Sequence, residues 1–136
     1  MPTQCTTKPL ILDHIEQCLD EIIQRLGKEI RVGLPLGLGK PPELINALYL
    51  RAKADPSINL TILTALSLEK PVAGSAVEAA FLTPFVERVW GDCPDLLYAV
   101  DATNSQLPAN VKVQEFFFKP GSRMGNSAAQ QNYVST

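Results

Sequence analysis

The sequence is poor in the residues from which metal sites and catalytic triads are built. It has one histidine, His14, and three cysteines, Cys5, Cys18 and Cys93. These residues are far apart and include no Cys-x-x-Cys pair, so the spacing of the usual zinc sites is missing. A Ser-His-Asp triad would have to use His14, which falls on the polar side of a predicted helix, where a solvated side chain is expected. Three scattered cysteines are no disulfide framework, so we expect a reduced, cytoplasmic environment.

A strong excess of charge is also missing. Twelve Lys and Arg residues against fourteen Asp and Glu residues give a net charge of −2. Without a basic stripe to neutralise phosphates, no nucleic-acid partner is expected. The longest apolar runs fall well short of the roughly 20 residues that cross a bilayer. The N-terminal stretch MPTQCTTKPLILDH has no apolar core of signal-peptide length. We therefore expect neither a membrane partner nor export.

The composition is that of a globular protein, with 46% hydrophobic and 19% charged residues. The patterns of apolar and polar residues predict helices and strands in alternation, which indicates a single α/β domain over residues 1–136. We expect a three-layer, mostly parallel sheet flanked by helices. The expected helices are 10–26, about 42–54, 75–82 and 85–90, and the expected strands are 30–36, 58–65 and 111–118. Residues 96–100 fit either a strand or a helix, and a further helix is expected from Ser127 onward.

The most informative stretch is Ile30 to Leu50, where an apolar run is followed by Gly37-Leu38-Gly39-Lys40, two prolines and a helical pattern. In a parallel sheet such a loop lies at the carboxyl end of a strand, where ligands bind. Backbone N–H groups and a helix N-terminus at this position favour an anion or an oxyanion. The stretch does not fit a P-loop, because Gly33 to Gly39 is one residue too long and Pro41 replaces the hydroxyl. It does not fit a dinucleotide-binding loop either, because Pro42 follows Gly37-x-Gly39 and no acidic residue stands at the end of the second strand. A tight turn without a ligand and an anion or acyl-group site both remain open.

Carboxylates are the remaining candidates for chemistry, because a glutamate can attack a thioester. Glu78 is explained by a capping box with Ser75, and Glu43 by the first turn of a helix. Glu115 is less usual, since it lies in an otherwise apolar strand. It either faces solvent or is buried with a partner. Arg123 follows a Pro-Gly-Ser turn, and it can be a ligand for a carboxylate or phosphate or an ordinary surface arginine.

Three pieces of the sequence resemble the N-terminal part of the acetyl-CoA hydrolase/transferase family, which belongs to the glutamate-dependent CoA-transferases. The first piece is IRVGLPLGLGKPPELINALYLRA, with its glycine loop and P-x-x-L-x-x-A-L helix. The second is the strand from Asn59 to Leu66 with the loop that follows. The third and most specific piece is LPANVKVQEFFFKPGSRMGNSAAQQNYVST. The resemblance covers about residues 30–136.

The resemblance implies a two-domain enzyme in which this chain is one half of a CoA-transferase-like fold and forms the acyl or carboxylate pocket. Residues 1–28 would be a leading helix, and residues 119–136 an incomplete C-terminal segment. The implied substrate-binding residues are Gly37, Leu38, Gly39, Lys40, Ser122 and Arg123. No catalytic or metal-binding residue maps onto the chain, because the nucleophilic glutamate is expected in a C-terminal CoA-transferase domain. The implied partners are an acyl-CoA, a small carboxylate and that domain. No cofactor is implied beyond the coenzyme A thioester as substrate, and a homodimer is compatible with the resemblance. A stand-alone, non-catalytic module that binds an anion or metabolite is the alternative.

Overall fold

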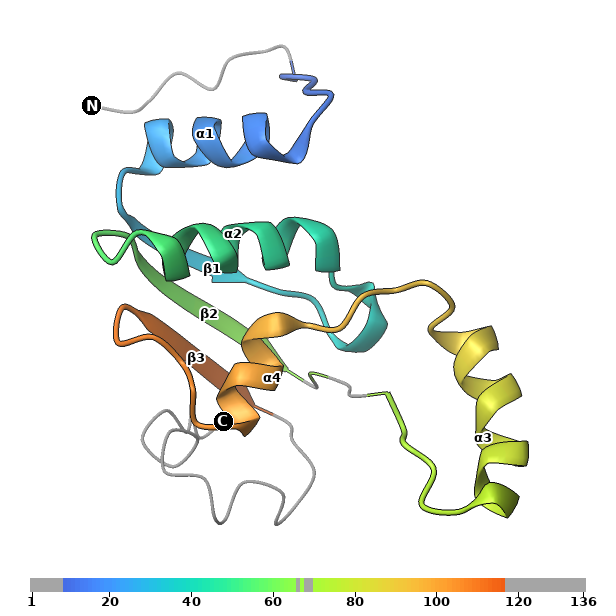
Figure 1. Cartoon of the computed structure of the whole chain (residues 1–136). Coiled ribbons are helices and arrows are strands. Elements are labelled where there is room, and N and C mark those ends of the chain that lie inside the picture. Colours follow the sequence, from blue (N-terminus) through green and yellow to red (C-terminus); the bar gives the residue numbers. More distant parts are fainter. Residues whose placement is uncertain (1–8, 66, 68–69, 117–136) are drawn as a thin grey trace.

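The computed structural model describes residues 9–65, 67 and 70–116 of the chain. Within these residues, three parallel strands form one open sheet in the order β1-β2-β3. Helices lie between successive strands (Figure 1), which confirms the predicted α/β class and the parallel sheet. In chain order the elements are α1 (Ile15–Leu26), β1 (Glu29–Gly33), a 3₁₀ turn (Gly37–Gly39), α2 (Pro42–Ala54), β2 (Asn59–Ala65), α3 (Ala76–Val89), α4 (Leu97–Thr103) and β3 (Val111–Phe116).

Helices α1, α2 and α4 cover one face of the sheet. The two crossovers proceed in the same direction across the sheet, and right-handed crossovers in one direction place their helices on the same face. Ile30, Leu60 and Val111 occupy one level of the three strands, and all three side chains are buried under these helices. On the opposite face, Leu63 is 43% exposed. The described residues therefore form two layers, and a third layer is not found among them.

The core lies between the sheet and this single helical layer. Its largest side chains are Tyr49 of α2 and Tyr98 of α4, both 0% exposed. Leu19 is the fully buried residue of α1. The other core residues are Ile30, Ile45, Leu48, Ala52, Ile58, Leu60, Ile62, Ala99, Val111 and Val113. The alternating pattern that predicted the second strand thus corresponds to real burial, because Ile58, Leu60 and Ile62 all belong to this core.

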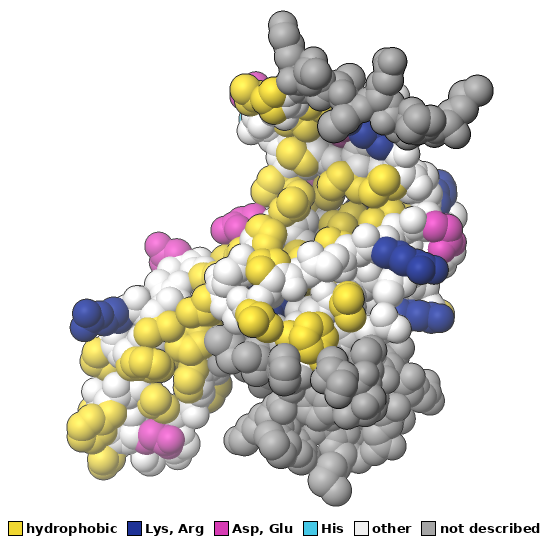
Figure 2. Space-filling model, turned by 180° about the vertical axis from the view of Figure 1, so that it is seen from behind, with side chains coloured by type: hydrophobic (Ala, Val, Ile, Leu, Met, Phe, Trp, Pro, Cys, Tyr) yellow, Lys and Arg dark blue, Asp and Glu magenta, His cyan; other side chains and the backbone are white. Residues whose placement is uncertain are grey.

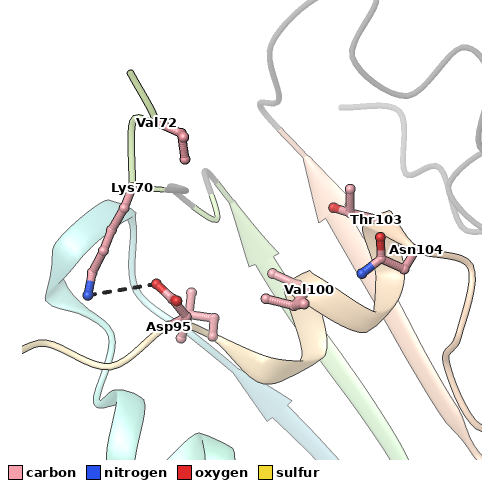
Figure 3. A pocket seen from close by; sticks show the side chains of 8 residues that line it. Lys70, Val72, Asp95, Val100, Thr103 and Asn104 are labelled. Carbon is pink, nitrogen blue, oxygen red and sulfur yellow. Dashed lines mark ion pairs between the residues drawn. The ribbon is translucent and has the colours of Figure 1, made fainter. Parts of the chain in front are cut away.

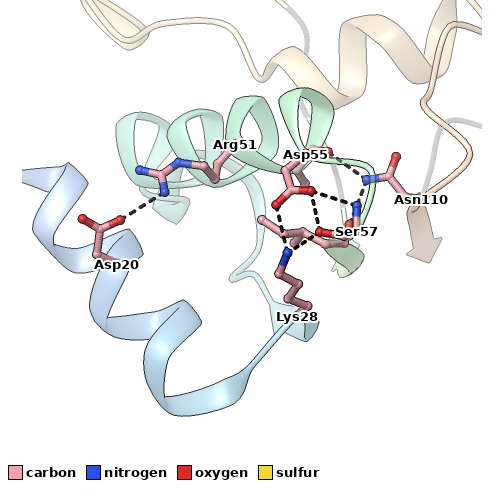
Figure 4. A network of polar contacts seen from close by, with 8 residues as sticks. Asp20, Lys28, Arg51, Asp55, Ser57 and Asn110 are labelled. Atoms are coloured by element: carbon pink, nitrogen blue, oxygen red, sulfur yellow. Dashed lines mark hydrogen bonds and ion pairs between the residues drawn. The ribbon is translucent and has the colours of Figure 1, made fainter.

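Polar side-chain contacts link the amino ends of the strands to the end of α2 (Figure 4). The side-chain amide of Asn110 donates to the carbonyl oxygens of Ala52 and Ile58, each at 2.8 Å. Lys28 Nζ lies 3.3 Å from Asp55 Oδ2 in the turn after α2. The Asn110 bonds connect the start of β3 to the end of α2 and the start of β2. The Lys28 ion pair connects the start of β1 to the turn after α2. The amino ends of all three strands are therefore held together by side-chain contacts.

The first helix and the first strand are shorter than the sequence pattern predicts. Helix α1 begins at Ile15 rather than residue 10, because His14 has an extended backbone and is the N-cap residue. Leu10 and Ile11 lie before it and are 55% and 84% exposed. Strand β1 ends at Gly33 rather than residue 36, although the next residue, Leu34, still donates its backbone N–H to Leu63 O at 2.9 Å.

Helix α3 is continuous, although Thr83-Pro84 predicted two separate pieces. Its start is as expected, since Glu78 N–H donates to Ser75 Oγ at 3.2 Å and Glu78 Oε2 accepts from Gly74 N–H at 2.8 Å. Pro84 removes one helical hydrogen bond, but no residue of α3 is buried. The carbonyl that loses its donor therefore faces solvent, which makes the interruption tolerable.

The remaining expectations are resolved in part. Residues 96–100, which fitted either element type, contribute to helix α4, and the helix near residue 42 ends at Ala54 as predicted. The end of the third predicted strand, the helix from Ser127 and the segment 119–136 lie outside the described residues. Among the helices of the described ranges, none combines the length and hydrophobicity that crossing a membrane requires.

Candidate functional site

The glycine loop leaves β1 as a single tight turn. Gly37 has a φ of +54°, a backbone conformation that a side chain would strain. Gly39 N–H donates to Leu36 O at 3.2 Å and closes the turn. The loop borders a hollow of about 20 Å³ whose far side includes Trp90 and Pro94. This volume suffices for about one water molecule, so within the described residues the loop does not open into a cavity for an acyl group.

Lys40, the last residue of the loop, turns inward. It is 5% exposed, whereas Leu38 is 46% exposed. The Lys40 ammonium donates to the carbonyl oxygen of Ala65, at the end of β2, over 2.8 Å, and also lies 3.4 Å from Gly37 O. One side chain therefore joins the loop after β1 to the carboxyl end of β2. The charged residue of the predicted loop site therefore lies beneath the loop surface.

Five polar side chains from separate elements gather at the carboxyl ends of the strands, and we call them the strand-end cluster: Lys40, Thr64, Ser67, Tyr98 and Glu115. Glu115 Oε1 accepts the Ser67 backbone N–H at 2.8 Å. The hydroxyl oxygens of Ser67 and Tyr98 are 3.0 Å apart. Thr64 is the register neighbour of Glu115 on the adjacent strand. Glu115 is thus half-buried, so it has the partner that its second interpretation requires but not the full burial.

Burial sets the electrostatics of this cluster. Removal from water lowers the pKa of Lys40, and the nearby Glu115 carboxylate opposes that shift. Burial also raises the pKa of Tyr98, while the hydroxyls of Ser67 and Thr64 act in the opposite direction. Thr64 Oγ1 approaches Tyr98, yet it is fully buried and has no hydrogen bond of acceptable geometry to any described residue. The cluster therefore combines a buried cation, a carboxylate and a hydroxyl with unused bonding capacity.

Helix α2 fixes the position of α4, and therefore of Tyr98. The side-chain amide of Asn46 donates to Asp95 O at 2.7 Å and accepts the Leu97 N–H at 2.9 Å, which caps the start of α4. Near the other end of α4, Tyr49 Oη donates to Asp101 Oδ2 at 2.5 Å. Two buried or half-buried polar contacts thus hold α4 against α2.

A larger hollow, of about 260 Å³, lies between α4 and the segment around residues 70–72. Figure 3 shows Lys70 and Asp95 on one side of it and Thr103 and Asn104 on the other. Lys70 Nζ lies 3.8 Å from Asp95 Oδ1. Apolar side chains, among them Val100, supply much of the remaining lining. The hollow is slightly smaller than the roughly 300–1,000 Å³ of typical small-molecule sites, so a ligand there would have to be small.

The structure locates four of the six predicted binding residues. Gly37, Leu38 and Lys40 border the small hollow, and Gly39 lies in the same turn. Ser122 and Arg123 lie outside the described residues. The sequence reasoning missed Thr64, Ser67 and Tyr98. Ser67 had a usable signal, since it follows a predicted parallel strand directly and so lies at the ligand-binding edge.

No group of three His, Cys, Asp or Glu residues suited to a metal ion occurs in the part of the chain that the structure describes. Comparisons of the chain with family models, curated proteins and solved structures found no match.

Proposed function

We propose that this chain helps form the acyl or carboxylate pocket of a CoA-transferase or acyl-CoA hydrolase, with a second domain closing the pocket over the glycine loop. A second α/β domain, separate from these 136 residues, would supply the nucleophilic glutamate and the coenzyme A site. The proposal is supported first by the resemblance of residues 30–136 to the acetyl-CoA hydrolase/transferase family. The observation that carries it in the structure is the buried Lys40 at the carboxyl ends of parallel strands. This is the edge at which α/β proteins bind ligands.

Lys40 would act through its charge rather than by direct contact. Its ammonium is surrounded by protein and bonded to Ala65 O, so its field is screened less than that of a surface lysine. A small carboxylate above the glycine loop would be attracted by this charge and by the loop N–H groups. Glu115 lies near enough to oppose part of the attraction.

In the proposed reaction, a glutamate of the second domain attacks the thioester carbonyl and the coenzyme A thiolate leaves. The thiolate then attacks the resulting anhydride at the glutamyl carbonyl, which releases the first carboxylate and leaves a glutamyl-CoA thioester. An incoming carboxylate accepts coenzyme A by the reverse steps, and in a hydrolase water replaces that carboxylate. The pocket between the two domains would hold the acyl group, and the loop N–H groups of this chain would stabilise the oxyanion.

The test is steady-state kinetics of the whole gene product that contains this sequence. Thiol release from acetyl-CoA and exchange with labelled acetate are followed for the wild type, Lys40→Met and the control Lys112→Met, which changes an exposed lysine of β3. We expect Lys40→Met to raise KM for the carboxylate about tenfold or more, and the control to leave it unchanged, because only Lys40 is buried near the pocket. A gene product without acyl-CoA turnover would refute the proposal.

The 136-residue chain alone supplies a second test. It should show no turnover with acetyl-CoA and acetate, because no nucleophilic glutamate is assigned to it. Rapid turnover by this chain would mean that the nucleophile lies within it, with Glu115 as the first candidate to replace by Gln. That outcome would contradict the proposed division of roles between two domains.

A stand-alone module that binds an anion or metabolite is the second candidate, favoured by the 260 Å³ hollow beside Lys70 and Asp95. Titration calorimetry of the chain with acyl-CoAs, short carboxylates and nucleotides separates the two. Tight binding of a phosphate compound unrelated to coenzyme A would favour the module. Its loss in Lys70→Met would assign it to the hollow.

A further inference from the structure

Helix α3 carries an apolar surface that the described part of the chain does not cover. It has 14 residues, none of them buried. Val77, Phe81, Phe85 and Val89 follow one another at four-residue intervals and are 73%, 77%, 51% and 37% exposed. This spacing places them along one side of the helix. In Figure 1 the helix extends away from the sheet and the other helices, and Figure 2 shows hydrophobic side chains along its length.

The order of side chains along α3 is nearly symmetric about Thr83. Val77 and Val89 are equally distant from this centre, and so are Phe81 and Phe85. The charges are arranged oppositely, because Glu78 on one side of the centre corresponds to Arg88 on the other. If two such helices lie antiparallel, each valine meets a valine, each Phe81 meets a Phe85, and each Glu78 is level with an Arg88.

We propose that α3 docks against α3 of a second copy of this chain, antiparallel and about a two-fold axis near Thr83. A two-fold contact uses the same surface of both molecules, so the surface must be complementary to itself. The apolar stripe and the opposite charges of α3 meet that requirement. In a parallel pair, by contrast, Glu78 would face Glu78, and Arg88 would face Arg88. The charges therefore select the antiparallel arrangement.

Two contacts support the helix that carries this surface. Ser75 caps the start of α3, and the Trp90 ring packs edge-on against Phe85 with centroids 6.0 Å apart. Neither the stripe nor the charged pair belongs to the core between sheet and helices. Substitutions on this face should therefore weaken association while the domain stays folded.

The experiment uses two charge variants of the full chain, Glu78→Arg and Arg88→Glu, in analytical ultracentrifugation. The wild type should dimerise reversibly. In a dimer of either variant alone, residues 78 and 88 of opposite chains carry the same charge at both ends of the contact. Its dimer dissociation constant should therefore rise at least about tenfold. A one-to-one mixture places the two arginines of one variant opposite the two glutamates of the other, so it should form a heterodimer with nearly wild-type affinity. Circular dichroism of each variant checks that it is folded.

The mixture also separates pairing from loss of a cap. Glu78 contributes to the N-terminal cap of α3, and a variant that merely weakened the helix would not recover on mixing. Phe81→Ser should abolish the dimer, whereas Val72→Ser, a change at an 89% exposed residue outside α3, should not. A wild-type chain that stays monomeric into the hundreds of micromolar would overturn the proposal. So would two charge variants that fail to associate with each other, since another segment or partner would then cover α3.

Discussion

Replacement of Thr64 by valine should make the protein more stable, although it removes a polar group from the proposed binding edge. Thr64 is 0% exposed, and Oγ1 has no hydrogen-bond partner among the described residues. A buried hydroxyl without a partner costs about 1–3 kcal/mol. Valine has the same β-branching and places a methyl group where the hydroxyl was, so no cavity opens. We expect the free energy of unfolding to rise by about 1–2 kcal/mol, or the melting temperature by roughly 4–8 °C.

Urea unfolding followed by far-ultraviolet circular dichroism measures this change. Thr61→Val is the matched control, because Thr61 lies on the other face of the same strand and is only half-buried. Thr61→Val changes the strand propensity in the same way as Thr64→Val, but it does not remove a fully buried hydroxyl. A Thr64→Val variant less stable than the Thr61→Val control would refute the reasoning, since it would mean that Oγ1 bonds to Tyr98. A stabilised variant with weaker carboxylate binding would show that the hydroxyl is retained for a ligand.

Three further changes test the cap of α3 and two contacts near the strand-end cluster. Ser75→Ala should cost about 1 kcal/mol by removing the α3 cap, and amide exchange should accelerate in the first turn of α3 but not in α2. Tyr49→Phe should cost about 2 kcal/mol at pH 7, because it removes a bond to a carboxylate. Hydrogen bonds from Lys53 and Tyr49 lower the pKa of Asp101 in the folded state. The stabilisation that these bonds provide should therefore disappear as the pH falls through the folded-state pKa of Asp101. The free-energy cost of Tyr49→Phe should decrease over the same pH range. An equal penalty at low pH would contradict this. The pKa of Lys40 is lowered in the folded state, so unfolding takes up a proton in alkaline solution. The free energy of unfolding of the wild type should therefore increase with pH between the folded-state pKa of Lys40 and its ordinary pKa of 10.5. The urea midpoint of Lys40→Met should not increase over this pH range.

Local patterns in the sequence predicted most of the helices and strands that the structure describes. The alternation at Ile58, Leu60 and Ile62 predicted β2, and Gly27 and Ser75 correctly marked the end of α1 and the start of α3. These signals work because each depends on neighbours within one or two helical turns or on strand periodicity. The interruption predicted at Pro84 was wrong, because it depends on more than the neighbouring residues. The effect of Pro84 depends on whether the helix around it is packed or exposed, and residues 83–84 alone contain no information on that.

The chain alone determined an α/β class with parallel strands, and it named Lys40 and Glu115 as residues to examine. It did not determine that the Lys40 ammonium turns inward to Ala65 O, or that Ser67, Tyr98 and Thr64 assemble beside Glu115. Those arrangements join residues 25 to 48 positions apart in the sequence. Only the order of strands and the docking of α4 on α2 bring them together, because side-chain direction and burial at a strand end are properties of the packed sheet.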